Sequence, residues 1–124
     1  MAPESKDKPQ HFRTKPRPGR VLVVRYRVAG TSAPEAAAVT RDVGPGGAFI
    51  TCAEPLPVGT ELELRLQLPA TRLHPGQTLT VLAEVRWHGH EHRSAGMGVA
   101  FRPLGAEEAL ALGEYFASLT GSEA

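Results

Sequence analysis

The chain has 124 residues, of which 41% are hydrophobic, so it is long enough to bury the core of one domain without disulfides or metals. Its formal net charge is only +1, which argues against DNA, RNA or an anionic membrane as a partner attracted by overall charge. The first 20 residues nevertheless carry a net charge of +4, whereas residues 104–124 hold four glutamates and no basic side chain.

Nothing in the sequence indicates export or membrane insertion. No run approaches the roughly 18 apolar residues that span a bilayer, and the N-terminus lacks the apolar stretch of a signal peptide. Cys52 is the single cysteine, so no intramolecular disulfide can form. We therefore expect a cytoplasmic protein in which Cys52 is a small buried side chain on a strand.

The N-terminal part divides into a tail and a basic arm. Residues 1–11 are polar and too poor in apolar groups to offset the entropy of ordering, which predicts a disordered tail. Residues 12–20 are predicted to be an extended arm, because Pro16 and Pro18 exclude helical geometry. One domain is expected over residues 12–120.

Six segments of the following stretch have the pattern of β-strands. Leucine alternates with polar residues throughout 60–68, which is the clearest period of two in the chain. Residues 36–41 are rich in alanine, but their short length between a proline and a glycine-rich turn favours a strand. The predicted strands are 21–28, 36–41, 47–52, 60–68, 78–87 and 96–101. Their succession predicts an antiparallel barrel or sandwich over residues 21–102.

Two further local features complete the predicted fold. The glycine-rich stretch 42–47 joins two predicted strands and is interpreted as a hairpin turn. After the last strand the apolar spacing changes to three or four residues, with Glu107 and Glu108 near the start, where they suit the helix dipole. We expect a C-terminal helix over about 105–119, lying against the strands.

The sequence contains no recognisable catalytic constellation. No serine lies in a nucleophile elbow or beside a matched histidine, so an enzyme is not predicted. His88, His90 and His92 alternate and could share a metal on one strand face, but their polar neighbours favour a solvated loop. No metal site is therefore predicted.

Several short motifs occur together in a fixed order. Arg13 and Arg17 form an Arg-x-x-x-Arg motif in the basic arm, and Asp42 to Gly47 follow as Asp-x-Gly-x-x-Gly. Leu56-Pro57-Val58-Gly59, Ala83-Glu84-Val85-Arg86-Trp87 and Gly96-Met97-Gly98-Val99-Ala100-Phe101 come later in the chain. In this order and spacing, the sequence resembles the PilZ domain family from about Phe12 to about Phe116.

This resemblance implies a six-stranded antiparallel barrel with a C-terminal helix, which acts as a bacterial receptor for cyclic di-GMP. It implies that Arg13 and Arg17 clamp the phosphates and guanine of the ligand, and that Asp42 accepts hydrogen bonds from a guanine edge. Gly47 would allow close approach of the backbone, and Trp87 would offer a stacking face unless it belongs to the core. A protein partner in a motility, secretion or signalling apparatus would receive the signal.

The second motif departs from the family pattern at Gly44, where the family has serine. A lost hydrogen bond of this kind weakens binding by about ten- to a hundredfold. This leaves open a ligand-independent adaptor that acts only by contact with a protein. Oligonucleotide binding by a small barrel is a third hypothesis, disfavoured by the few aromatic residues and the near-zero net charge.

Overall fold

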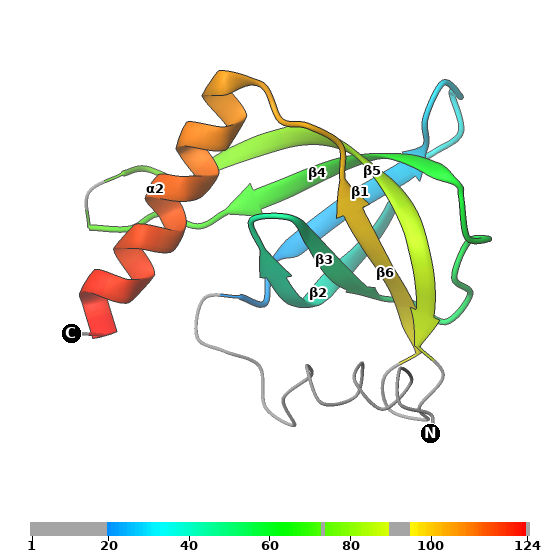
Figure 1. Ribbon diagram of the computed structural model, residues 1–124, viewed down its shortest axis with the longest axis horizontal. Helices are drawn as coiled ribbons and strands as arrows, with labels where there is room; N and C mark the ends of the chain where they lie inside the picture. The colour runs from blue at the N-terminus through cyan, green and yellow to red at the C-terminus, as the bar shows by residue number, and fades with distance from the viewer. Residues whose placement is uncertain (1–19, 73, 90–94, 124) are drawn as a thin grey trace.

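The chain folds into six strands followed by one helix (Figure 1). This computed structural model describes residues 20–72, 74–89 and 95–123, without the side chains of 120–123. The predicted tail, and the predicted arm up to residue 19, lie outside the described residues. The elements are β1 (Val23–Val28), β2 (Ala36–Gly44), β3 (Gly47–Thr51), β4 (Glu61–Leu68), β5 (Gln77–Gly89), β6 (Gly96–Phe101) and α2 (Ala106–Glu123).

The strands close into a barrel with the order β1-β2-β3-β6-β5-β4. Each neighbouring pair is antiparallel, and β1 pairs with β4 to complete the ring. The ribbon therefore presents no unpaired sheet edge between β1 and β4 (Figure 1). The prediction of an all-β domain, built as a six-stranded antiparallel barrel with a C-terminal helix, is confirmed.

The core follows from the alternation of the strands. In β4 the leucines at positions 62, 64, 66 and 68 are all buried, while Arg65 and Gln67 between them are exposed. The same inward side of the neighbouring strands supplies further fully buried residues, including Val24, Ile50, Val85 and Met97. A period of two thus gives the barrel an apolar interior and a polar outer surface.

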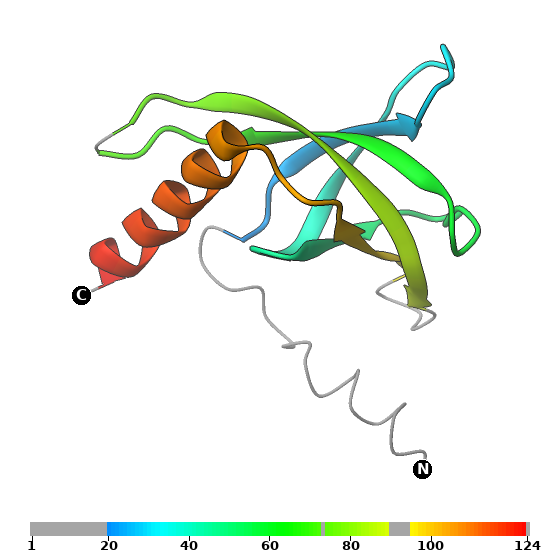
Figure 2. The ribbon, with the colours of Figure 1, turned by 45° about the horizontal axis from the view of Figure 1, so that its top comes forward.

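Helix α2 lies across one open end of the barrel, as the turned view shows (Figure 2). Leu112 and Tyr115 of the helix pack in a second cluster with residues from four strands or their flanks: Leu22, Val43, Leu68 and Leu79. The helix begins at Ala106 and extends to Glu123, beyond the predicted end at about 119. Within the described residues, no helical segment has the length and hydropathy of a membrane span.

Two strands are longer than their sequence patterns predicted. β2 continues from Arg41 to Gly44, and Gly44 pairs with Gly47, so the predicted hairpin has Pro45 and Gly46 at its turn. β5 continues to Gly89 and includes His88, for which the sequence favoured a loop. The His88 Nε2 atom lies 2.7 Å from the carbonyl oxygen of Leu56, in the segment between β3 and β4. His90 and His92 lie outside the described residues.

Cys52 lies one residue beyond the end of β3 and is only partly buried, so its prediction as a buried strand residue is corrected. It packs at the margin of the main core beside Tyr26. Burial raises the pKa of the Cys52 thiol, and a hydrogen bond with Tyr26 offsets part of that increase.

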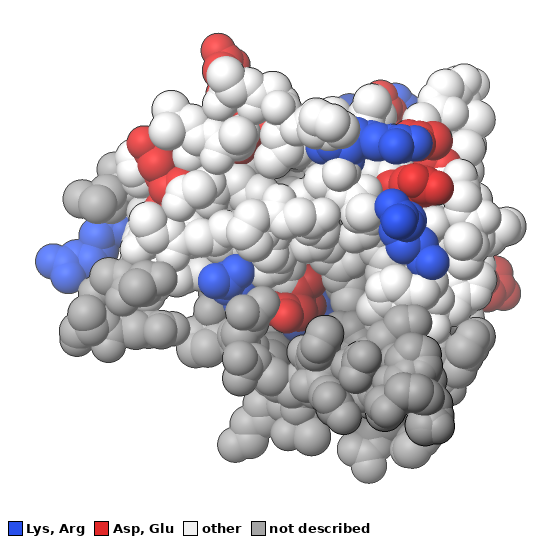
Figure 3. Space-filling model, viewed as in Figure 1, with Lys and Arg blue, Asp and Glu red and all other residues white. Residues whose placement is uncertain are grey.

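The outer surface of the barrel carries interleaved charges of both signs. Arg102 forms ion pairs with Glu61 and Glu84, and Arg27 lies 2.9 Å from Glu63. On the face drawn in Figure 3, blue and red side chains adjoin one another over the strands rather than forming a single-sign patch. Exposed pairs of this kind contribute about 0–1 kcal/mol each, so the core rather than the charges stabilises the barrel.

Candidate functional site

A bulge in β2 directs Asp42 to the outside of the barrel. Thr40 pairs with Ile50 and Asp42 pairs with Phe49, so Arg41 is the extra residue of the bulge. Thr40 and Val43 are both buried, whereas Arg41 and Asp42 between them are partly exposed. An uninterrupted strand would alternate strictly and place Asp42 on the same inner side as Thr40. The bulge therefore presents the carboxylate on the surface.

A second bulge, in β5, directs Trp87 to the outside of the barrel. Val85 pairs with Val99 and Trp87 pairs with Gly98, so Arg86 is the additional residue. Val85 is fully buried, while Trp87 is only partly buried and lies on the outer side. The alternative that Trp87 belongs to the core does not hold, because the bulge changes which side it faces.

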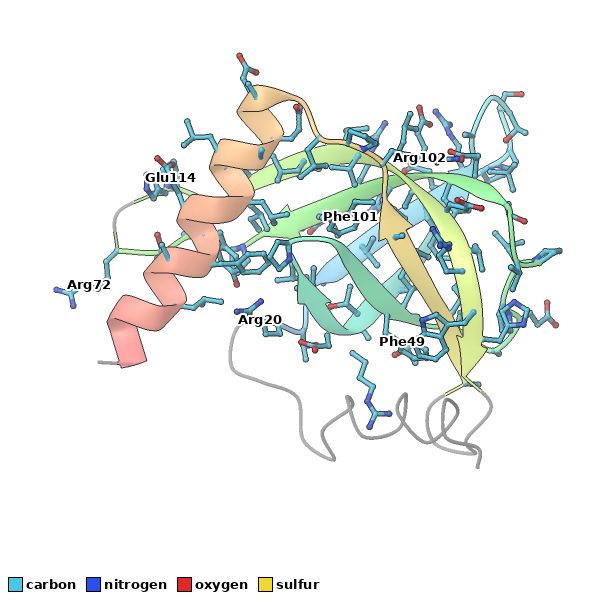
Figure 4. All side chains as sticks on the ribbon, in the orientation of Figure 1. Arg20, Phe49, Arg72, Phe101, Arg102 and Glu114 are labelled. Atoms are coloured by element: carbon cyan, nitrogen blue, oxygen red, sulfur yellow. The ribbon has the colours of Figure 1, made fainter. Side chains whose placement is uncertain are left out.

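Two glycines of β6 form the surface on which the aromatic rings lie. A Cβ atom at Gly98 would come within 2.3 Å of the Trp87 indole, and one at Gly96 within 2.9 Å of the Phe49 ring. Phe49 and Trp87 contact each other across β6 with their ring centroids 5.3 Å apart and an interplanar angle of 31°. Phe49 is labelled beside β5 and β6 in Figure 4. The missing side chains of β6 thus permit an aromatic pair on the outer side of the strands, in which Phe49 is buried and Trp87 is partly exposed.

A shallow, open groove of about 210 Å³ lies beside the two aromatic rings. It contains four of the six residues that the sequence predicted for ligand binding. The other two, Arg13 and Arg17, lie outside the described residues. The groove is lined by Asp42, Val43, Gly44, Gly47, Ala48, Phe49, Trp87 and Val99.

The two glycines of the second motif have different structural roles. A Cβ atom at Gly44 would meet no atom within 4 Å, so this position opens onto free space. At Gly47 a Cβ atom would lie 2.2 Å from the Val99 carbonyl oxygen, in the paired strand β6. Gly47 is therefore needed for the strands to approach each other, whereas Gly44 accepts a larger side chain.

The described chain begins at Arg20, directly beside the groove. Thr40, which is 1% exposed, donates its hydroxyl hydrogen to the Arg20 carbonyl oxygen at 2.9 Å and accepts from the Leu22 N–H at 2.8 Å. The Thr40 N–H also donates to the Leu22 carbonyl oxygen at 2.9 Å. Three hydrogen bonds thus join the base of the basic arm to β2, two residues before Asp42.

The Arg20 guanidinium connects this segment with the helix. Its Nη1 atom donates to the Val43 carbonyl oxygen at 2.8 Å, and its Cζ atom lies 4.2 Å from the centroid of the Phe116 ring. In Figure 4, Arg20 lies between α2 and the β2–β3 hairpin. The pKa of the adjacent Tyr115 is raised by burial, while the positive charge of Arg20 acts in the opposite direction.

The residues that line the groove are of the kinds that bind a ligand. It combines one carboxylate, an aromatic face and the backbone of a glycine-rich hairpin, which suit a planar ligand with hydrogen-bond donors. Among the described residues, no three metal-ligating side chains come together. Of the three alternating histidines, only His88 belongs to the described residues.

The sequence interpretation did not select Phe49, Gly98, Thr40 or Arg20. The alternating glycines of β6 were a usable signal, because glycine inside a strand often marks the close approach of another group. The roles of Thr40 and Arg20 had no such signal, since both depend on which strand lies beside the arm.

The closed barrel, the helix over its end and the surface groove define a small β-barrel recognition domain. The family model described as the PilZ domain matches residues 8–118, so the chain belongs to the PilZ domain family. No sequence among curated proteins matches it significantly.

Several solved structures share the fold, and two of them illustrate the likeness. One is the Bacillus subtilis inhibitor of motility (MotI/DgrA), which is 20% identical with a TM-score of 0.65, over 83% of this chain and 48% of that protein. The chain therefore spans about half of that structure. The other is the PilZ domain of CeSA from a cellulose-synthesizing bacterium, which is 18% identical with a TM-score of 0.55, over 86% of this chain and 96% of that domain. At these identities the likeness concerns the fold alone.

Proposed function

We propose that this protein is a cyclic di-GMP receptor that regulates a protein partner when its basic arm orders around the ligand. PilZ domain proteins are cyclic di-GMP receptors or adaptors. The observation that carries the proposal is the groove in which Asp42, Gly44, Gly47 and Trp87 come together. Residues far apart in the chain thus share one surface site.

The groove suits one guanine base of the ligand. The Asp42 carboxylate can accept hydrogen bonds from the N1 and N2 hydrogens of guanine, and Trp87 offers a face for stacking. At about 210 Å³ the groove is smaller than the roughly 300–1,000 Å³ typical of ligand pockets. The remaining ligand surface would therefore require another part of the chain to cover it.

The basic arm is the natural candidate for that cover. Arg17 precedes Arg20 by three residues, and three residues of extended chain span at most about 11 Å, which is short enough for the arm to reach the groove from Arg20. The base of the arm is held beside the groove by Thr40. Arginine binds phosphate through two parallel hydrogen bonds, which suits Arg13 and Arg17 to the diester groups.

Direct titration with cyclic di-GMP tests this function. We expect calorimetry on the full chain to give saturable binding that Arg17→Ala weakens at least about tenfold, because a charged hydrogen-bonding partner is lost. Arg72→Ala is the matched control, since Arg72 is an exposed arginine outside the groove lining. Absence of saturable binding, or equal losses in both variants, would contradict the proposal.

Gly44 gives a second test in the opposite direction. Because a side chain at this position meets no atom within 4 Å, Gly44→Ser is expected to fold normally. The added hydroxyl should tighten binding by about tenfold if it forms the hydrogen bond that serine makes in the family. Gly44→Ala is the control, because it adds the carbon atom without the hydroxyl.

The second candidate function is a ligand-independent adaptor that docks on a protein of a motility, secretion or signalling apparatus. It is favoured by glycine at position 44, which lacks the family's serine hydroxyl. Under this alternative, Arg13→Ala and Arg17→Ala leave cellular activity unchanged. A phenotype caused by these substitutions at normal protein levels would exclude the adaptor and favour the receptor.

A further inference from the structure

Val43 at the rim of the groove already packs in one apolar cluster with Leu112 and Tyr115 of α2. One polar side chain adds a second link between the groove rim and the C-terminal half of the helix. Arg20 donates to the carbonyl oxygen of Val43, the residue between Asp42 and Gly44, and its guanidinium lies over the Phe116 ring. The first contact lies at the groove and the second on the helix. Both depend on one guanidinium plane, so movement of either partner alters the other contact.

The surroundings restrict the position of Arg20. Its backbone carbonyl accepts from Thr40, and the following Leu22 is 2% exposed within the cluster that contains Leu112 and Tyr115. The backbone at Arg20 is therefore held against β2, while the nearby Leu22 packs against the helix. A side chain fixed at its base transmits displacement better than a freely rotating one.

We propose that Arg20 is a positioning residue that couples the ligand groove to helix α2, which makes α2 the element that reports ligand occupancy. Arg20 carries this coupling through Val43 at the groove rim and Phe116 on the helix. The proposal extends the proposed function, on which its ligand-dependent part rests. By linkage, a ligand that stabilises the groove rim stabilises the packing of α2, and a change in α2 alters ligand affinity by the same factor.

Four substitutions separate loss of the Arg20–Phe116 contact from loss of packing. Phe116→Leu keeps an apolar side chain and removes the aromatic face, whereas Phe116→Tyr retains that face. Arg20→Gln removes the charge and the planar fork from the other side of the contact. Leu119→Ala removes helix packing from the same cluster but keeps both the Arg20 guanidinium and the Phe116 ring, and so controls for loss of packing.

The first measurement needs no ligand. Hydrogen exchange of the segment Asp42 to Gly47 is compared with that of β4 in the full chain, which corrects for global destabilisation. We expect Phe116→Leu and Arg20→Gln to accelerate exchange in the groove segment by about fivefold or more, with Phe116→Tyr and Leu119→Ala unchanged. If Phe116→Leu behaves like Leu119→Ala, the coupling is overturned.

The second measurement adds cyclic di-GMP and follows two sites. Trp87 is the only tryptophan and lies in the groove, so its fluorescence reports occupancy. We expect the ligand to slow exchange in α2 of the unmodified protein, and Phe116→Leu to abolish that slowing and weaken binding by about fivefold or more. Phe116→Tyr should restore both effects.

The outcomes separate the two proposals. If neither Trp87 fluorescence nor calorimetry detects cyclic di-GMP binding, the receptor function fails, and the ligand-free comparison alone decides whether Arg20 couples the groove to α2. If the ligand binds but exchange in α2 stays the same, the receptor stands and the coupling is wrong.

Discussion

At the scale of single residues, Gly98 determines whether the aromatic wall of the groove can form. Its absent side chain leaves the space that the Trp87 indole occupies, and Trp87 in turn contacts Phe49. Gly98→Ala should displace the indole and destabilise the protein by about 1–3 kcal/mol through overpacking. A shift in Trp87 fluorescence together with a lower urea midpoint would support this expectation.

The control for this substitution lies in the same groove. Gly44→Ala adds the same methyl group in open space within a strand, so the fluorescence should not change and the urea midpoint should not fall. Equal effects of the two alanines would mean that the close contact at Gly98 does not hold the indole.

The Tyr26 and Cys52 pair predicts a loss of stability at alkaline pH. Burial raises the pKa of the Tyr26 phenol, with a further contribution from Cys52, and burial also raises the pKa of the Cys52 thiol. Both groups are neutral when protonated, so folding retains their protons. In the unfolded chain the pKa is about 8.5 for the cysteine and about 10 for the tyrosine. The contribution of each group to stability is complete below its unfolded pKa and is lost as the pH rises through the higher folded pKa.

Urea unfolding measured between pH 7 and pH 10.5 checks this expectation. The free energy of unfolding should decrease above about pH 8.5, and less steeply in a Tyr26→Phe, Cys52→Ala variant. Some slope should remain, because burial also raises the pKa of Tyr115. An identical slope in the variant and the unmodified protein would contradict a role for this pair.

At the scale of elements, α2 contains a glycine that its packing does not require. A Cβ atom at Gly113 would meet nothing within 4 Å, and glycine within a helix is less favourable than alanine. Gly113→Ala should therefore raise the free energy of unfolding by about 0.5–1 kcal/mol. Chemical denaturation of the two proteins measures this difference.

The loop between β1 and β2 provides the opposite case. A Cβ atom at Gly30 would also meet nothing within 4 Å, but the φ of 80° at this residue lies in the left-handed region. Gly30→Ala should lower stability by about 1–2 kcal/mol for that reason. Stabilisation by both alanines would show that space alone, and not backbone conformation, governs these sites.

The elements also show how far the sequence pattern could be followed. All six strands and the helix were predicted, because alternation and the change to helical spacing are local properties of the chain. The ends of β2 and β5 were missed, since the glycines and polar residues there extend a strand only when a neighbouring strand pairs with them. Burial of Cys52 was overestimated for a similar reason, as it lies just past the last paired residue of β3.

At the scale of the whole molecule, barrel and helix share one apolar cluster, which predicts that they unfold cooperatively. The cluster at the end of the barrel combines Leu112 and Tyr115 of α2 with Leu22, Val43 and Leu68. Thermal unfolding followed by Trp87 fluorescence and by the helical circular dichroism signal should therefore give one midpoint. Leu112→Ala should lower the midpoints of both signals together and reduce the free energy of unfolding by about 2–5 kcal/mol. Separate midpoints would show that α2 unfolds independently of the barrel.

The sequence by itself determined the strand periodicity, the C-terminal helix and the residue types of the candidate site, because these depend on spacing along the chain. Only the tertiary structure decided which side Asp42 and Trp87 face. Each follows a bulge that reverses the strand's alternation, and a bulge is defined by pairing with another strand. The groove, and the contact of Arg20 with both Val43 and Phe116, exist because strand pairing and the packing of α2 bring distant segments together.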